Sequence, residues 1–484
     1  MVPCFFGVPG QNERTGSALP RYGLTALIVA CAIFMETLDG TVISTSLPAI
    51  AADLHQDPIT LKLALTSYLL SLAIFIPASG WAADRFGART VFRIAILVFT
   101  LGSILCGLSS TLPEFIGARI LQGVGGAMMV PVGRLVLLRS VERSEMVNAL
   151  AYLMIPALLG PICGPLIGGF ITTYLQWRWI FFVNVPIGIL GVTLVSLFIK
   201  NIRAEAAWPL DVKGFLLLGS GLAALVFGIT VTGRGLVGRP IVIGLIGSGA
   251  LLLTGYALHA RKAAFPILDL RLLAIPTFRA SILGGALFRI GVGALPLLLP
   301  LMLQIGFGMN AFQSGSVTFV SSAGAMLMKA TATPILHRFG FRRVLVFDAV
   351  LSAGFFASYG FFTPATPIIA MMGVLLVGGF VRSLEFTSIN AIAYAEIDSA
   401  AMSRATSFTA VAQQLSLSFG IAVGAFVIEM AQSARDGAHL AAADFRWAFV
   451  VVAVISASSA FWFLRLPRDA GGSLVGERRG VMKA

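Results

Sequence analysis

Long apolar stretches recur along the whole chain, each long enough to cross a bilayer as a helix. About 20 predominantly apolar residues span the hydrocarbon core of a membrane. In lipid the backbone finds no outside hydrogen-bond partner, so we predict a helix for each stretch. The predicted spans are 22–50, 61–82, 90–110, 113–138, 147–175, 179–200, 212–232, 240–260, 278–305, 313–336, 343–362, 366–395, 405–430 and 445–465.

The composition agrees with lipid as the main solvent. Of 484 residues, 57% are hydrophobic and only 11% are charged, and the mean hydropathy is +0.92. A soluble domain carries about 25% charged residues. The predicted fold class is therefore an all-α polytopic membrane protein with fourteen transmembrane helices. The first 20 residues lack the features of a cleavable signal peptide, so we expect the first span to act as an uncleaved anchor.

The distribution of basic residues predicts the topology. A net charge of +13 could indicate nucleic-acid binding, but Lys and Arg gather in the loops after the even-numbered spans and in the C-terminal tail. Positive charge favours the cytoplasmic side of a membrane. We therefore expect a multi-pass protein of the cytoplasmic (inner) membrane with both termini in the cytoplasm, and no nucleic-acid partner.

The sequence offers no set of residues for catalysis or metal binding. An intramembrane enzyme needs a nucleophile with a base, or metal ligands, at membrane depth. The four histidines lie in loops or at span ends, so we predict that the protein is not an enzyme. The cysteines lack metal-ligand spacing and are interpreted as small apolar side chains; they are Cys4, Cys31, Cys106 and Cys163.

The chain contains an internal repeat. DRFGARTV at 84–91 corresponds to HRFGFRRV at 337–344, an offset of 337 − 84 = 253, and Val-Gly-Gly recurs at 124–126 and 377–379 with the same offset. Such repeats are common in secondary transporters, whose substrate binds near the midplane at the repeat interface. The alternative is a duplication that serves structure alone.

The repeat predicts the domain organisation. Residues 1–200 form an N-terminal six-helix bundle and 278–466 a C-terminal six-helix bundle. A linker at 201–277 holds two extra transmembrane helices, and 467–484 form a cytoplasmic tail. We expect a monomer, because the repeat interface lies within one chain.

Two acids interrupt the first span, FMETLDGTVISTSLPAI at 34–50. An ionised carboxylate at the centre of a membrane helix costs roughly 2.5–3.5 kcal/mol. Glu36 lies three residues before Asp39, so both are expected to face a central cavity, which favours their protonated forms. The hypothesis is that Asp39 binds a proton from outside and releases it inside, in competition with cargo. The alternative for either acid is a purely structural role.

Other charges also lie within spans. Arg119, in ARILQGVGGAMMVPVGR at 118–134, has Asp39 as an available partner, although it could also extend to the membrane surface. Arg289, Arg382 and Glu385 are candidates for a substrate cavity. Because Arg382 and Glu385 are three residues apart on one helix, the alternative for them is a self-contained ion pair.

Two further segments combine glycine with an unusual pattern. GWAADRFGARTV at 80–91 is either an ordinary basic loop or a latch that breaks as the halves move; the latch residues are Gly80, Asp84, Arg85, Gly87 and Arg89. GPICGPLIGGF at 160–170 offers a flat surface for close helix packing. Its packing residues are Gly160, Gly164, Pro165, Gly168 and Gly169.

Together with LDGTVISTSLPAI and WRWIFFVNVPIG, these segments resemble the major facilitator superfamily and, within it, the drug:proton antiporter family with 14 spanning helices. The first-span Asp of that family matches Asp39, and its fourth-span Arg matches Arg119. Its loop motif matches Asp84, Arg85 and Arg89, and its antiporter glycine motif matches the segment at 160–170. Two positions depart from the pattern: an early glycine of the antiporter motif is Ala151 here, and the second-half loop has His337 where the first has Asp84.

The resemblance implies a major-facilitator fold and proton-driven export of drugs or other amphipathic small molecules by alternating access. Its partners are the substrate, protons and the lipid bilayer, and it needs no cofactor besides the proton gradient. The alternative is an exporter of a specific metabolite, such as an amino acid, a siderophore or a self-made toxin. The need for a periplasmic adaptor is left open.

Overall fold

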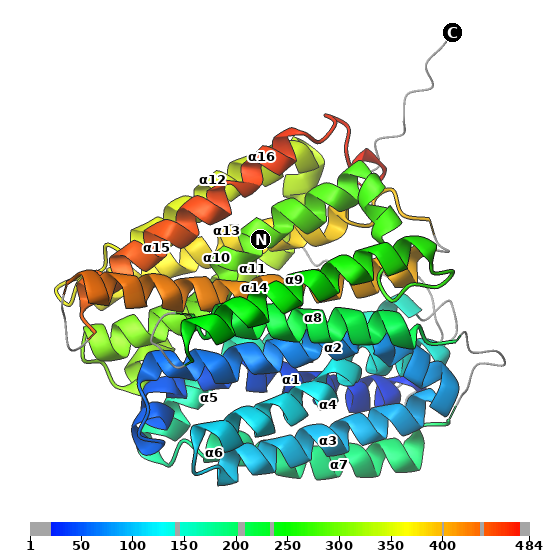
Figure 1. Cartoon of the computed structure of the whole chain (residues 1–484), viewed down its shortest axis with the longest axis horizontal. Coiled ribbons are helices and arrows are strands. Elements are labelled where there is room, and N and C mark those ends of the chain that lie inside the picture. Colours follow the sequence, from blue (N-terminus) through cyan, green and yellow to red (C-terminus); the bar gives the residue numbers. More distant parts are fainter. Residues whose placement is uncertain are drawn as a thin grey trace, which may run out of the picture.

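The structure is a computed structural model, which describes residues 21–140, 146–201, 209–232, 237–398, 401–435 and 440–474. The described residues form α-helices joined by short turns, without a β-strand, and most helices run side by side along the length of the molecule (Figure 1). Cys4 and the side chain of Ala151 lie outside the described residues.

The described helices coincide with all fourteen predicted spans, with ends shifted by a few residues. Helices α6 and α7 together form the sixth span, and α15 and α16 the fourteenth. The helices are α1 (Arg21–Asp53), α2 (Lys62–Phe86), α3 (Ala88–Leu108), α4 (Leu112–Ser140), α5 (Met146–Tyr174), α6 (Trp179–Phe182), α7 (Asn184–Phe198), α8 (Val212–Thr230), α9 (Arg239–Lys262), α10 (Pro276–Leu301), α11 (Ala311–Phe339), α12 (Phe341–Tyr359), α13 (Ile368–Ile392), α14 (Met402–Ala434), α15 (Ala442–Ala457) and α16 (Ser459–Leu464).

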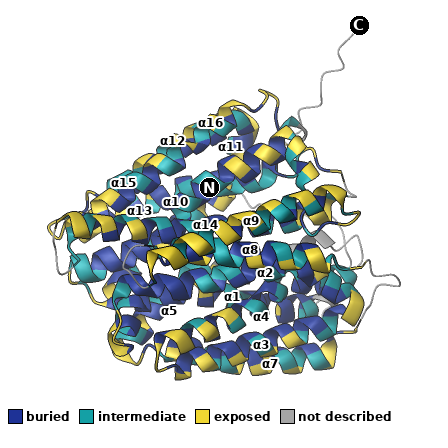
Figure 2. Ribbon diagram, viewed as in Figure 1, coloured by how far each residue is buried: buried dark blue, intermediate teal, exposed yellow. Residues whose placement is uncertain are grey.

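Length and composition support a multi-pass membrane protein. Among the described residues, 11 helical segments are long and apolar enough to cross a membrane. Helix α12 is not one of them, and its charged residues Arg342, Arg343 and Asp348 lie within its first eight positions. The outermost helices expose large apolar side chains, such as Leu251 on α9 and Leu197 on α7, as a surface in contact with lipid tails requires (Figure 2).

The internal repeat is visible in the helix ends. Helices α2 and α11 end at Phe86 and Phe339, which are 339 − 86 = 253 residues apart. Each is followed by a glycine with positive φ, 94° at Gly87 and 74° at Gly340, where a residue without Cβ avoids strain. Helices α3 and α12 then begin directly. The same tight turn at the same offset supports the duplication inferred from the sequence.

The helices pack as two groups with an inserted pair. In the first half α1 packs against α5 and α4, and in the second α11 packs against α13 and α10 against α14. The halves meet where α5 contacts α11 and where α2 contacts α14, and α8 lies against both α2 and α14. The predicted fold class is thus confirmed, while the domain limits at 200/201 and 277/278 stay predictions.

Candidate functional site

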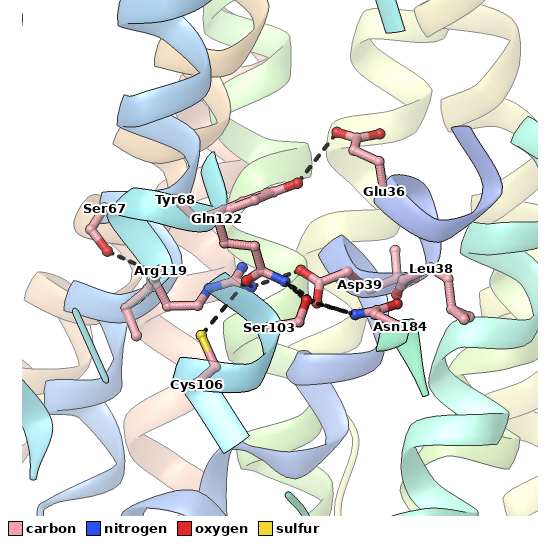
Figure 3. Close-up of polar contacts among 12 residues, drawn as sticks. Glu36, Leu38, Asp39, Ser67, Tyr68, Ser103, Cys106, Arg119, Gln122 and Asn184 are labelled. Atoms are coloured by element: carbon pink, nitrogen blue, oxygen red, sulfur yellow. Dashed lines mark hydrogen bonds and ion pairs between the residues drawn. The ribbon is translucent and has the colours of Figure 1, made fainter. Parts of the chain in front are cut away.

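The acid of the first span and the arginine of the fourth form a buried ion pair. Arg119 Nη1 on α4 lies 2.7 Å from Asp39 Oδ2 on α1, and each side chain is 1% exposed (Figure 3). Two opposite charges removed from water stabilise the fold only if good geometry and further hydrogen bonds offset their desolvation. The surroundings of Asp39 supply those hydrogen bonds.

Two amide side chains complete the shell of Asp39. Gln122 Nε2 donates to Asp39 Oδ1 at 2.8 Å, and Asn184 Nδ2 donates to the same oxygen at 3.2 Å. Ser103 Oγ on α3 accepts a hydrogen bond from each of these amides, which fixes their orientation. Asp39 therefore faces three side chains that all donate. Hydrogen bonds to charged groups are the stronger ones, so these donors help to offset the desolvation of the ion pair.

Glu36 occupies a different environment from Asp39. Its side chain is partly exposed, and Tyr68 Oη on α2 donates to Glu36 Oε1 at 3.4 Å. The Tyr68 ring lies under the Arg119 guanidinium, 4.1 Å from ring centroid to Cζ, so Tyr68 connects the two acids through Arg119 (Figure 3). We expected both acids to face a central cavity. In this conformer Asp39 instead lies in the interior of the first half.

The glycines of α5 allow α1 to approach closely. A Cβ at Gly160 or Gly164 would collide with Thr37 or Thr41 on α1, and one at Gly168 would meet the backbone at Val42. Helix α1 therefore has α5 against one face and the Asp39 network on another.

The end of the glycine segment reaches the second half. A Cβ at Gly169 would lie 2.5 Å from the carbonyl oxygen of Ala311 on α11. The carbonyl of Pro165 similarly lies against Gly315 of α11. The segment at 160–170 thus packs against both α1 and α11.

The predicted latch residues form contacts within the first half. Asp84 Oδ1 pairs with Arg139 Nη2 on α4 at 2.6 Å, and Arg89 donates to the carbonyl oxygen of Ile199 at 3.2 Å. Arg85 is exposed, and the space around Gly80 is open. These contacts join α2, α3, α4 and the end of α7. Breakage of the Asp84–Arg139 pair during transport stays a prediction.

The structure does not gather the three charged candidates of the second half into one cluster. Arg289 Nη2 donates to Asn390 Oδ1 at 2.9 Å, and Arg382 Nη2 donates to Ser321 Oγ on α11 at 3.2 Å. Glu385 is 0% exposed, and neither of its carboxyl oxygens has a hydrogen-bond partner among the residues that the structure describes. The alternative of an Arg382–Glu385 ion pair is therefore wrong for this conformer.

Sequence reasoning missed an ion pair that joins the two halves. Lys62 Nζ on α2 lies 2.8 Å from Glu429 Oε1 on α14, with side chains 2% and 6% exposed. A lysine on the predicted outer side opposes the positive-inside trend, and this exception could have pointed to Lys62. Gln122 and Asn184 were also missed, because uncharged polar residues within spans are common.

Further contacts between the halves lie toward the predicted outer end. Gln304 Nε2 donates to the carbonyl oxygen of Thr45 at 2.9 Å, and the Phe312 amide donates to Thr173 Oγ1 at 2.9 Å. With Lys62–Glu429 they hold the outer ends of the halves together. Across the described chain, no group of three or more His, Cys, Asp or Glu side chains is placed to hold a metal ion.

Comparison with known proteins identifies the family. The sequence matches the Major Facilitator Superfamily over residues 29–421 and again over 281–481. A relative from Salmonella paratyphi B, provisionally named multidrug resistance protein MdtD, is 37% identical over 461 residues, covering 93% of this chain and 96% of the relative. A protein of the same name from Yersinia enterocolitica is 36% identical over 458 residues, covering 92% and 95%.

Solved structures share the fold at low sequence identity. The D-xylose–proton symporter has a TM-score of 0.65 at 15% identity, covering 93% of this chain and 98% of the symporter. The POT family transporter PepTSo has a TM-score of 0.66 at 14% identity, covering 92% and 99%. With the helical packing and the family match, these likenesses show that the chain belongs to the major facilitator superfamily of membrane transport proteins.

Proposed function

We propose that this protein exports drugs or other amphipathic small molecules across the cytoplasmic membrane in exchange for protons, by alternating access, with both termini in the cytoplasm. The observation that carries the proposal is the buried Asp39–Arg119 pair, because a charged pair at 1% exposure is costly to keep without a role. The relatives provisionally named multidrug resistance proteins and the resemblance to the drug:proton antiporters support the choice of cargo.

The geometry suggests how a proton affects the network. In this conformer Arg119 neutralises Asp39, and the amides of Gln122 and Asn184 donate to the carboxylate. A proton that binds Asp39 removes the charge that holds Arg119. Arg119 still has the carbonyl oxygen of the Gln122 side chain and the face of the Tyr68 ring as partners. Return to this conformer restores the ion pair and expels the proton.

Alternating access requires the outer contacts between the halves to open. The Lys62–Glu429 pair and the hydrogen bonds from Gln304 and Phe312 must all break for the outer ends to separate. We infer that these contacts close the outer side while Asp39 is ionised. Protonation of Asp39 and opening of the outer side then belong to the same stage of the transport cycle.

The test is transport by the purified protein in liposomes with an imposed pH gradient, with a panel of amphipathic compounds and with metabolites. Asp39→Asn is expected to abolish gradient-driven transport, because an amide cannot carry the proton. Asp53→Asn is the matched control, since Asp53 is a partly exposed acid at the C-terminal end of α1, where it pairs with Arg178. Undiminished gradient-driven transport by Asp39→Asn would contradict the proposal. Transport of one metabolite and no drug would instead favour the specific exporter.

A further inference from the structure

We propose that Asp348, Glu385 and Arg289 form a second proton-binding site, in the second half of the protein, in which one of the two carboxyl groups carries a proton. Helix α12 supplies Asp348, α13 supplies Glu385 and α10 supplies Arg289. Its part in coupling rests on the proposed function, whereas its proton occupancy does not. We name these three residues the α12–α13 site.

The side chains of the α12–α13 site are buried and incompletely paired. Glu385 and Arg289 are 0% exposed and Asp348 is 4% exposed. Both oxygens of Glu385 and Oδ2 of Asp348 lack hydrogen-bond partners, as do Nε and Nη1 of Arg289. A carboxylate that is buried without a donor binds a proton rather than remain charged. The missing donors at Glu385 therefore indicate a neutral carboxyl group.

The charges of the site require one proton for neutrality. Arg289 lies beside this part of α13, because its Nη2 donates to Asn390 and its Cζ lies 5.5 Å from the centroid of the Phe386 ring. Helix α12, which carries Asp348, packs against α13. One arginine offsets one ionised acid, and two acids in the same low-dielectric region cannot both ionise cheaply. A single proton on the acid pair gives the site zero net charge.

The neighbouring helices supply no further partner for Glu385. On α13 itself, Arg382 donates to Ser321 Oγ, and Tyr359 of α12 carries an uncharged phenol at neutral pH. Lys329 on α11 is exposed and donates to Thr387. The Tyr394 hydroxyl is likewise uncharged at neutral pH. Arg289 is thus the basic group placed to respond to Glu385.

Arg289 provides a second state for the site. In this conformer its Nη2 donates to Asn390, and its Nε and Nη1 are free to donate elsewhere. Loss of the proton from Glu385 creates a carboxylate that can accept hydrogen bonds from these two nitrogens. The site can therefore alternate between a protonated Glu385 and a Glu385–Arg289 ion pair.

The internal repeat shows that the fold does not require these acids. At the offset of 253, Asp348 corresponds to Ala95 (348 − 253) and Glu385 to Val132 (385 − 253). Both counterparts are buried and belong to the apolar core of the first half. The same helix pair packs with apolar residues in one half and with two acids in the other, so a role beyond packing is needed to explain the acids.

The decisive measurement is the infrared carbonyl stretch of protonated carboxyl groups in the purified full-length protein at neutral pH. Glu385→Gln is expected to remove about one protonated carboxyl group per molecule, because the neutral group itself is lost. Asp348→Asn is expected to remove about one as well, because Glu385 then becomes the single acid beside Arg289 and ionises. Arg289→Gln is expected to add about one, because both acids then become neutral. Glu396→Gln is the matched control, since Glu396 is an exposed acid just after α13.

An unchanged spectrum in Glu385→Gln would contradict the proposed proton-binding site. So would an Arg289→Gln spectrum without an additional protonated carboxyl group. Size-exclusion elution and thermal unfolding establish that each variant is folded, and the three variants make the test independent of any one of them. The proton-to-cargo ratio in liposomes tests the role in coupling. If the wild-type protein moves no protons with cargo, the proposed function is wrong. The infrared result still tests whether the α12–α13 site binds a proton. A wild-type ratio in Glu385→Gln would exclude the site from coupling.

Discussion

The two halves of the protein share a helix arrangement but place their buried charges differently. In the first half, Asp39 is fully paired with Arg119 and two amides. In the second half, Glu385 has no hydrogen-bond partner and Arg289 is only partly satisfied. The two halves therefore share a helical scaffold but carry different buried polar groups.

The repeat offset makes this difference explicit. Asp39 corresponds to Val292 (39 + 253) and Arg119 to Met372 (119 + 253), so the second half has no copy of the first pair. Arg119 lies seven residues after the predicted outer start of α4, and Glu385 seven residues before the predicted cytoplasmic end of α13. At 1.5 Å per residue each lies about 10 Å from its helix end, toward opposite faces of the membrane.

The largest expected loss of stability follows replacement of Arg119, and it should exceed the loss that follows replacement of Arg289. Arg119→Met leaves Asp39 as an unpaired buried charge, and removal of one partner of a buried pair costs about 3–5 kcal/mol. Arg289→Met is expected to cost less, about 1 kcal/mol, since it removes one hydrogen bond and the acids can become neutral. Thermal unfolding in detergent measures both, with the exposed Arg134→Met as control. Equal losses for the two variants would remove the distinction between a paired and an unpaired site.

The ion pair that links the halves is expected to have the next largest effect. Lys62→Met removes the lysine that pairs with Glu429, at a cost near the lower end of the range for a broken buried pair, about 3 kcal/mol. The double variant Lys62→Met/Glu429→Leu is expected to recover much of that stability, because no buried charge remains. A double-mutant cycle of unfolding free energies measures the coupling. Additive losses would show that the two residues do not act as a pair.

A smaller effect is expected at Gln122. Gln122→Leu removes one donor to Asp39 and leaves Ser103 with fewer partners, at a cost of about 1–3 kcal/mol. Leu375 is the counterpart of Gln122 in the second half (122 + 253), and Leu375→Gln adds an unpaired amide to that core. Both substitutions should destabilise the protein in thermal unfolding. A neutral Gln122→Leu would mean that the amide is not needed to hold the carboxylate.

The smallest expected effect concerns Tyr68. Tyr68→Phe removes the 3.4 Å hydrogen bond to Glu36 but keeps the ring under Arg119. A loss of about 0.5–1.5 kcal/mol is expected, as for a single ordinary hydrogen bond. Tyr68→Leu, which also removes the ring, should cost more because the cation–π contact is lost. If both variants unfold at the same temperature, the ring contributes nothing to the placement of Arg119.

The fold could be predicted from sequence because span length and charge placement are local properties of the chain. The Asp39–Arg119 pair could be anticipated because charges in apolar spans are rare and seek each other. The amides of Gln122 and Asn184 could not, since their contacts depend on how each helix is rotated about its axis. Asp348 was missed because it follows a basic pair at a predicted cytoplasmic end. Spacing along the chain misled for Arg382, which bonds to Ser321 on a neighbouring helix instead of to Glu385.

The inserted helices α8 and α9 cover one side of the molecule. Because α8 lies against both α2 and α14, lipid tails there meet the insert before they meet the seam between the halves (Figure 1). The insert therefore covers the seam between α2 and α14, and the halves meet again where α5 contacts α11. The two extra spans thus shield one of these two seams from lipid tails.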